Sequence, residues 1–483
     1  MDAIRSVTKN ALLLITSEII GKIITFFYIV IAARYLGVDN FGSLSFTLAF
    51  TSFFTFLMDA GLGRLQTREI ARDRSHADKI TSNILFLKFF LGIANFVVMA
   101  IIINLMGYPQ QIVLLVYIIG LSVVLSNFGV AFEAVFQGFE TMGYIGISHI
   151  ISSTILLLGA ILITNNGGGL TEFALLYLLS IIVVVIFEFV VSIKKFVSLD
   201  KAVDIKFCKH LLHEAFPFTL SGMFSMVYLK FDSILLSVFK GQKAVGLYSA
   251  PSSLSDSLNL FYSSFMTALF PVTSRLYKYS KDKLMFSFEK SLKYLLVISI
   301  PIAIGTSVIS DKIIGLIYGA EYTPSVMVLQ ILIWSAVLVF INLIISNLLN
   351  SIDKQVSVAK QNAMAAMLNF TLNLILIPSY SYIGASIASF ITQLFSLLYL
   401  YSSVSKTEFK LPKKAFLVIL SKVAFASFVM VVFTFYLRLM NIFLLVPLST
   451  ILYFFTFYLV GGIDKYDFEI AKKLVSGLAL KES

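Results

Sequence analysis

The chain has 483 residues, of which 58% are hydrophobic and 13% charged, and its formal net charge is +11. Its mean hydropathy of +0.93 implies more apolar surface than one soluble core can hide, which excludes an ordinary globular protein. The only cysteine, Cys208, excludes an intrachain disulfide and a cysteine metal cluster. The sequence therefore predicts an all-α integral membrane protein.

Apolar stretches of about 20 residues recur along the whole chain, and each is long enough to cross a bilayer as a helix. Strands are not expected, because open sheet edges cannot face lipid. The first stretch is too long for a cleavable signal and holds Glu18 and Lys22. We expect about fourteen transmembrane helices, at residues 10–33, 41–62, 84–106, 112–137, 146–164, 173–193, 215–239, 247–270, 294–310, 326–349, 356–377, 382–401, 415–436 and 441–461.

Lys and Arg are concentrated in every second connection between these stretches. With the N-terminus in the cytoplasm, 28 of the 37 basic residues fall in cytoplasmic segments and 5 in outer loops. This asymmetry predicts a multi-pass protein of the cell membrane with both termini in the cytoplasm. The basic residues are spread over many short connections, so contact with anionic lipid explains the positive charge better than nucleic-acid binding does.

A pattern of two glycines and a serine occurs with identical spacing after the first and the seventh predicted span. Its members are Gly37, Gly42 and Ser45 in the first copy, and Gly241, Gly246 and Ser249 in the second. Six spans separate the copies, so both halves begin on the same side of the membrane. The pattern predicts two six-helix bundles in a pseudo-two-fold repeat, at residues 1–200 and 201–405. Two additional helices and a cytoplasmic tail follow at 406–483.

Three further motifs, at residues 33–46, 59–72 and 136–140, resemble the polysaccharide transporter family. This family belongs to the multidrug/oligosaccharidyl-lipid/polysaccharide (MOP) flippase superfamily and includes O-antigen and teichuronic-acid flippases. The resemblance covers essentially the whole chain and implies a MATE-like fold. It also implies translocation of polyprenyl-diphosphate-linked oligosaccharide from the inner to the outer leaflet by alternating access, for cell-surface polysaccharide or glycan biosynthesis.

Other functions stay open at this stage. An ion-coupled multidrug or cation antiporter of the same superfamily is one alternative, although that class usually has twelve helices. A membrane-embedded glycan polymerase or ligase would need a sizeable outer loop, and a scaffold without transport is a further alternative. We expect no enzymatic activity and no cofactor. The expected partners are the lipid-linked oligosaccharide and membrane lipids, with H⁺ or Na⁺ and glycan-assembly proteins as candidates.

Two lysines inside predicted spans are candidates for binding the substrate diphosphate. Lys22 lies about 12 residues into the first span, and Lys230 lies about 15 residues into the seventh, so both are near mid-membrane. The repeat places Lys230 one helical turn from the position equivalent to Lys22. Two ammonium groups on equivalent helices would suit a lipid diphosphate. The alternative is that Lys22 pairs with Glu18, four residues earlier, and that Lys230 pairs with another carboxylate.

Carboxylates inside the spans are candidates for lining the cavity and for coupling transport to an ion. A secondary transporter needs such groups to bind H⁺ or Na⁺. The candidates are Glu18, Glu133, Asp232 and Asp256. Their alternative role is to neutralise nearby lysines.

Arg64, Arg68 and Arg72 repeat at four-residue spacing after the second span, and Arg275 lies at the corresponding end of the eighth. These arginines are candidates for a cytoplasmic entrance that attracts the diphosphate. A stripe that faces lipid headgroups is the alternative.

Three further charges lie towards the ends of predicted spans. Lys88 and Lys422 lie near cytoplasmic ends, where their side chains can extend to the interface. Glu188 lies within a turn or two of the interface and is expected to reach water.

Overall fold

The structure, a computed structural model, describes residues 2–199, 203–409, 413–464 and 467. Side chains are described except at 2–12, 56, 216–230, 259–265, 267–268, 271 and 413–415. Within these limits the regular elements are helices, with no strand. The architecture is therefore all-α, as predicted.

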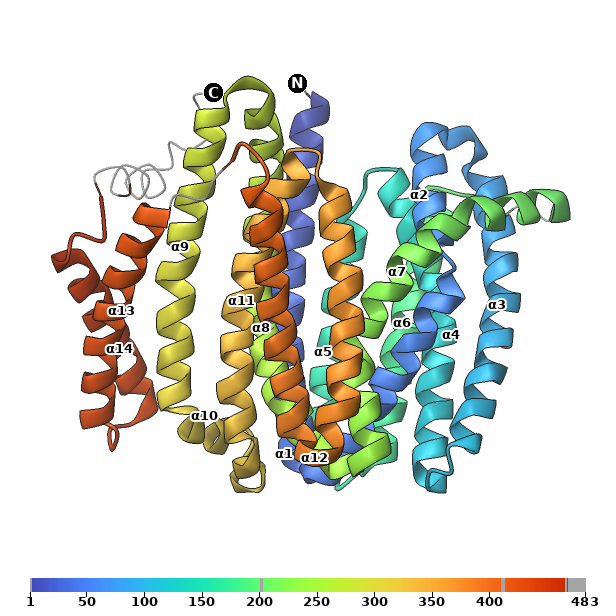
Figure 1. The fold of residues 1–483 in the computed structure, drawn as a ribbon. Helices are drawn as coiled ribbons and strands as arrows, with labels where there is room; N and C mark the ends of the chain where they lie inside the picture. Colours follow the sequence, from blue (N-terminus) through green and yellow to red (C-terminus); the bar gives the residue numbers. More distant parts are fainter. Residues whose placement is uncertain (1, 200–202, 410–412, 465–466, 468–483) are drawn as a thin grey trace. The chain divides into compact units, whose positions relative to one another are not determined.

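The helices follow one another with short connections, as the ribbon shows (Figure 1). In chain order they are α1 (Asp2–Asp59), α2 (Leu62–Arg72), η1 (Arg74–His76), α3 (Ala77–Leu105), α4 (Gln110–Gly138), α5 (Gly143–Asn165), α6 (Leu170–Lys195), α7 (Ile205–Lys240), α8 (Gln242–Tyr279), α9 (Lys281–Val308), α10 (Ser310–Ile317), η2 (Ala320–Ser325), α11 (Val326–Ser351), α12 (Gln355–Ser405), α13 (Lys413–Tyr436) and α14 (Ile442–Leu459).

Ten helical segments in the described part of the chain are long and apolar enough to cross a membrane. Two of these helices, α1 and α12, are longer than one membrane crossing needs. Each consists of two helical segments joined by a sharp bend. The bends lie at Gly37 and Ser381, where φ is 70° and 53°. Each long helix therefore holds two of the predicted spans, and the structure is compatible with fourteen. The protein is a multi-pass membrane protein.

The predicted repeat is visible in the backbone at its first glycine. Gly37 has φ 70° and ψ 176°, and Gly241 has φ 77° and ψ −176°. This left-handed φ with an extended ψ is strained for any residue with a Cβ, so both positions require glycine. The same sharp bend therefore follows the first helix of each predicted half.

The second glycines of the repeat pack against each other's helix. A Cβ at Gly42 would overlap the carbonyl oxygen of Gln242, and a Cβ at Gly246 would overlap that of Val38. Such backbone-to-backbone contact between membrane helices depends on small residues. The two copies of the pattern therefore form a contact with each other between α1 and α8.

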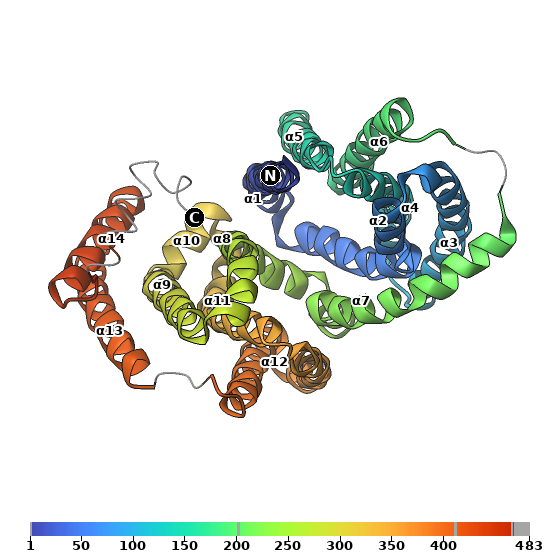
Figure 2. The same cartoon turned by 90° about the horizontal axis from the view of Figure 1, so that it is seen from above.

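The chain divides into two compact units. Unit 1 comprises residues 1–260, 317–328 and 362–388, and unit 2 comprises 261–316, 329–361 and 389–483. Within unit 1, α1 packs on α4 and α5, and α4 packs on α3 and α6. Figure 2 shows α3 beside α4 and α5 beside α6. Within unit 2, α13 packs on α9 and α14. The predicted domain boundaries near residues 200 and 405 stay a prediction.

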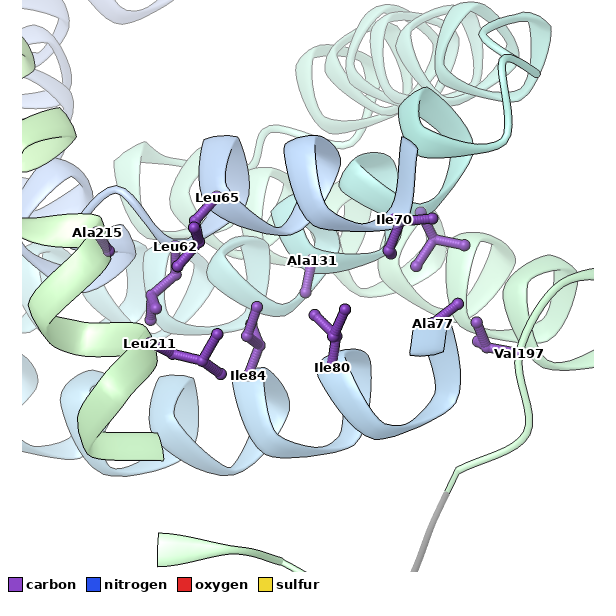
Figure 3. Close-up of a cluster of buried hydrophobic side chains, with 11 residues drawn as sticks. Leu62, Leu65, Ile70, Ala77, Ile80, Ile84, Ala131, Val197, Leu211 and Ala215 are labelled. Atoms are coloured by element: carbon purple, nitrogen blue, oxygen red, sulfur yellow. The ribbon is translucent and has the colours of Figure 1, made fainter. Parts of the chain in front are cut away.

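The short helix α2 is amphipathic, and its apolar face is buried in unit 1. Leu62 and Leu65 of α2 pack in one cluster with Ile84 of α3 and with Leu211 and Ala215 of α7, all less than 4% exposed. Figure 3 shows these side chains filling the space between the three helices. The cluster fixes how α2 is rotated, so its arginines lie on the opposite face.

Candidate functional site

A buried charge pair lies where α1 ends. The side chain of Lys88, on α3, is 0% exposed, and its Nζ donates to Asp59 Oδ1 at 2.7 Å. Lys88 Nζ also donates to Asn127 Oδ1 on α4 at 2.9 Å, and Asn127 Nδ2 donates to the Met58 carbonyl at 3.2 Å. The expectation that Lys88 extends to the membrane interface is wrong. Its side chain turns inward, because a carboxylate and an amide oxygen there compensate the burial of the ammonium.

The turn between α1 and α2 holds Asp59 in place. Ala60 and Gly61 have φ of 47° and 72°, so the chain reverses sharply before α2 begins. The Gly63 N–H then donates to Asp59 Oδ1 at 3.1 Å. A carboxylate is favourable at the N-terminus of a helix such as α2, because the free N–H groups there carry a partial positive charge. Asp59 therefore closes the first turn of α2 and balances the charge of Lys88.

Two glutamates lie next to this pair on α4 and α6. Glu133, a predicted ion-coupling residue, is half-buried, and its charge acts on both Lys88 and Glu188. Glu188 is 1% exposed, so the expectation that it reaches water is wrong. A Cβ at Gly129 would lie 2.7 Å from Glu188 Oε2, so the glycine leaves room for the carboxylate to point into the bundle.

Lys22 and Glu18 lie on α1 against α5. Lys22 is exposed and Glu18 is half-buried. Both side chains are described, and they do not form the ion pair that we considered as an alternative. Both charges act on the imidazole of His149, at the place where Gly21 packs on the His149 carbonyl. The ammonium of Lys22 is therefore not held by Glu18.

The candidates on α7 and α8 differ in their surroundings. Lys230 belongs to α7, and its side chain lies outside the described residues. Asp232 is 8% exposed and accepts hydrogen bonds from the Tyr248 hydroxyl and, at 2.9 Å, from the Ser233 N–H. Asp256 is exposed on α8. Asp232 is thus a buried carboxylate that already has donors, whereas Asp256 lies at the surface.

The three arginines of α2 have different partners. Arg68 pairs with Glu69 at 2.7 Å and with Glu214 of α7 at 2.5 Å, and Arg72 pairs with Glu69 at 3.1 Å. Arg64 is exposed and, among the described residues, is in no ion pair. The predicted basic face is therefore partly neutralised, and Arg64 is its most available cation.

Unit 2 carries a second charge cluster, where the segment after α14 meets α9. Lys290 pairs with Asp464 at 2.5 Å, and Lys293 pairs with Asp467 at 2.5 Å, with cross-contacts of 3.1 and 3.4 Å. The cluster attaches the end of the chain's described part to α9.

Arg275, the last predicted entrance residue, is exposed on α8.

Sequence reasoning missed Asp59 and Asn127 as partners of Lys88. Asp59 begins a motif that we used only as a sign of family resemblance, and it lies 29 residues before Lys88. Asn127 is 39 residues after Lys88 and is a polar residue inside an apolar helix. That last feature is the signal that could have indicated a buried polar network.

Solved structures define the class of fold. The structure matches a chain described as "Lipid II flippase MurJ, inward closed conformation" with a TM-score of 0.78 and 18% identity, covering 93% of this chain and 98% of that one. It also matches an inward-facing multidrug resistance MATE family transporter of the MOP superfamily, with a TM-score of 0.67 and 17% identity over 80% and 96% of the two chains. The protein therefore has the fold of MOP superfamily transporters.

Family models and relatives narrow this class. The model for the polysaccharide biosynthesis protein family matches residues 7–277, so the chain belongs to that family. The MatE model matches residues 217–375. A Haloferax volcanii protein described as a probable low-salt glycan biosynthesis flippase, Agl15, is 27% identical over 35% of this chain and 36% of its own length. A putative O-antigen transporter of Shigella flexneri is 24% identical over 66% and 78%.

Another relative, an uncharacterized membrane protein of Methanocaldococcus jannaschii (MJ1068), is 29% identical over 50% of this chain and 49% of its own length. The chain thus spans about half of this relative and about a third of the Haloferax protein.

Proposed function

We propose that this protein is a flippase that moves polyprenyl-diphosphate-linked oligosaccharide from the inner to the outer leaflet, for cell-surface polysaccharide or glycan biosynthesis. The observation that carries the proposal is membership of the polysaccharide biosynthesis protein family over residues 7–277. Two relatives described as a glycan biosynthesis flippase and an O-antigen transporter support it. The protein is not an enzyme in this proposal and needs no cofactor.

Alternating access is the mechanism that suits this fold. The substrate headgroup is large and charged, so it must cross through a polar path while the lipid tail stays in the bilayer. The pairing of Gly42 with α8 and of Gly246 with α1 supports such a mechanism, because the two helices meet there mainly through backbone atoms. Contacts between backbones can part and re-form without repacking long side chains.

Lys22 is the proposed handle for the diphosphate. It is exposed on a membrane-spanning helix and is not paired with Glu18, so its ammonium is available to an anion. Lys230 is the proposed second cation, from the repeat. Glu18, Glu133, Asp232 and Asp256 are the proposed cavity and ion-coupling carboxylates, for H⁺ or Na⁺. Arg64, Arg68, Arg72 and Arg275 are the proposed cytoplasmic entrance.

The proposed location is the cell membrane, with both termini in the cytoplasm. The sorting of Lys and Arg between alternate connections supports this orientation. Glycan-assembly proteins are proposed partners, because the lipid-linked substrate must be made inside and used outside.

The test is a leaflet-sided protection assay. Purified protein is reconstituted into vesicles with a fluorescent polyprenyl-diphosphate oligosaccharide, and a membrane-impermeant reagent then modifies the label on the outer leaflet only. We expect protein-containing vesicles to make the inner-leaflet pool accessible and empty vesicles to protect it. Equal protection in both would overturn the proposal.

The MatE match at residues 217–375 supports one alternative, an ion-coupled multidrug or cation antiporter. Counter-transport of a lipophilic organic cation in the same vesicles separates the two functions. Cation flux without lipid translocation would favour the antiporter. The exposed lysine on α1 counts against it, since an ammonium in the path repels a cationic substrate.

A further inference from the structure

Two polar atoms in unit 1 are buried without a hydrogen-bond partner in the same region, and a third buried hydroxyl lies beside them. The two are Oε1 of Glu188 and Oγ of Ser192. The third is the Ser148 hydroxyl, which lies within hydrogen-bonding reach of the Glu188 carboxylate. Glu188 and Ser148 are each 1% exposed, and Ser192 is 0% exposed. Buried polar groups normally have hydrogen-bond partners, so two buried oxygen atoms without partners on one helix face call for an explanation. We refer to these three residues as the Glu188 pocket.

The three side chains converge from α5 and α6. Ser192 lies four residues after Glu188 on α6, so the two share one face of that helix. Ser148 of α5 lies beside the Glu188 carboxylate. Glycine at position 129 of α4 leaves the room into which Glu188 Oε2 points. The carboxylate is thus enclosed by α4, α5 and its own helix.

Few charges face this pocket from the helices around it. Glu133 lies four residues after Gly129 on α4, and its charge acts on Glu188. Lys88 of α3 reaches Glu133 electrostatically, but it is neutralised by its ion pair with Asp59 of α1. On α5, His149 follows Ser148 in the sequence, and the charges of Glu18 and Lys22 on α1 act on its imidazole. No described basic residue pairs with Glu188.

An ionised carboxylate would be expensive in this setting. Burying a charge without a partner is strongly unfavourable, and a second carboxylate nearby adds repulsion. A proton on Oε1 of Glu188 removes the charge and turns the orphaned oxygen into an O–H donor, for which the Ser192 hydroxyl oxygen is a candidate acceptor. We propose that Glu188 is a proton-binding residue within the N-terminal helices, and that the like charge of Glu133 favours its protonated form.

A metal cation fits the pocket less well. A bound cation needs most of its coordination shell filled by oxygen atoms. Here one carboxylate and two hydroxyl groups converge, and the described residues contain no cluster of three or more acidic, histidine or cysteine side chains that could hold a metal ion. A proton needs only one oxygen.

Proton binding gives the proposed flippase a coupling ion. This use rests on the proposed function, whereas proton binding itself does not. The site would be occupied when the pocket is closed from water, as in this structure, and would release its proton when the helices part and water hydrates the carboxylate.

Infrared spectroscopy of the purified protein tests proton binding without any transport assay. We expect a protonated-carboxyl C=O band at neutral pH that is lost in Glu188→Gln and retained in Glu172→Gln. Glu172 is the matched control, because it is an exposed glutamate on the same helix. Absence of the band in the wild type, or its persistence in Glu188→Gln, would overturn the proposal.

Thermal unfolding provides a second readout that guards against misfolding. Glutamine has the shape of a neutral glutamic acid, so Glu188→Gln should fold and unfold at the wild-type temperature or above it. Glu188→Lys, which fixes a charge there, should lower the unfolding temperature. A wild-type stability that rises with Na⁺ and loses this rise in Glu188→Gln would identify a sodium site instead and overturn the proposal.

If the infrared result holds, a vesicle assay with an imposed pH gradient examines coupling. Lipid translocation by the wild type should respond to the gradient, and translocation by Glu188→Gln should not. A response that persists in Glu188→Gln would overturn coupling through this site. Absence of lipid translocation at any gradient would overturn the proposed function and leave the proton site in place.

Discussion

Asp59 and Lys88 form an ion pair of 2.7 Å in which the lysine is completely buried and the aspartate side chain is 20% exposed. Asp59 has a second donor, the Gly63 N–H, and some access to solvent. Lys88 has only protein acceptors, namely Asp59 and Asn127. Lys88 therefore depends on Asp59 to compensate its charge more than Asp59 depends on Lys88.

This asymmetry predicts unequal costs for breaking the pair. Asp59→Asn leaves the Lys88 ammonium buried without a counter-charge, and we expect it to lower the free energy of unfolding by about 3–5 kcal/mol. Lys88→Met leaves Asp59 hydrated and bonded to the Gly63 N–H, so the expected cost is smaller, about 1–3 kcal/mol. Unfolding of the detergent-purified variants by heat or denaturant measures both.

The matched control is Lys79→Met, because Lys79 lies on the same helix but is exposed. Lys79 forms an exposed ion pair with Asp204 at 3.7 Å, and removing such a surface pair should cost less than about 1 kcal/mol. Equal costs for Asp59→Asn and Lys88→Met, or a larger cost for Lys88→Met, would contradict the prediction.

The contact between Gly42 and Gly246 predicts that neither position tolerates alanine. In each variant the new Cβ meets a backbone carbonyl, so α1 and α8 must move apart. We expect each substitution to lower the free energy of unfolding by about 1–3 kcal/mol, which is typical of overpacking. Gly143→Ala is the control, since a Cβ there meets nothing within 4 Å. A loss no greater than that of Gly143→Ala would contradict the contact.

Much of the fold could be predicted from the sequence, because spans and bends are local properties. Hydropathy located the helices, and the repeat placed Gly37 and Gly241 at equivalent connections after the first helix of each half, where the structure has two bends of the same geometry. The burial of Lys88 could not be predicted in this way. Position along a helix gives depth in the membrane, but the direction of the side chain depends on Asp59 and Asn127, which are distant in sequence.

The arginines of α2 predict a graded effect on anion binding. Arg64 is exposed and outside any described ion pair, whereas Arg68 is held by Glu69 and Glu214. If this face attracts a diphosphate, Arg64→Ala should weaken binding of polyprenyl diphosphate about fivefold, since one basic residue near a membrane surface contributes about 1 kcal/mol. Arg68→Ala should have a smaller effect. Equal effects in both variants would favour a stripe that faces lipid headgroups.

The cluster after α14 predicts a pH-dependent stabilisation. Burial by itself would raise the pKa of Asp464 and Asp467, but hydrogen bonds, mainly from Lys290 to Asp464 and from Lys293 to Asp467, outweigh it and hold both pKa values below the usual 3.8. The ionised carboxyls therefore stabilise the fold above pH 3.8, and this stabilisation is lost as the pH falls further.

We expect the wild type to unfold at a higher temperature than Asp467→Asn at neutral pH. The difference should shrink as the pH falls below 4. Unfolding temperatures measured over this range give the comparison. A difference that stays constant into acid would mean that Asp467 acts through its shape and not through its charge.

Translocation of the lipid-linked oligosaccharide by the wild type and by Lys22→Ala, in vesicles with a leaflet-specific reagent, decides whether this protein is a flippase with Lys22 as its diphosphate handle. Lys195→Ala is the control, because Lys195 is an exposed lysine that already bonds to the Tyr144 hydroxyl at 2.7 Å. We predict exposure of the inner-leaflet label by the wild type and by Lys195→Ala, and a loss of at least tenfold in rate for Lys22→Ala. Protection of that label in wild-type vesicles would contradict the flippase, and an unchanged rate in Lys22→Ala would contradict the role of Lys22.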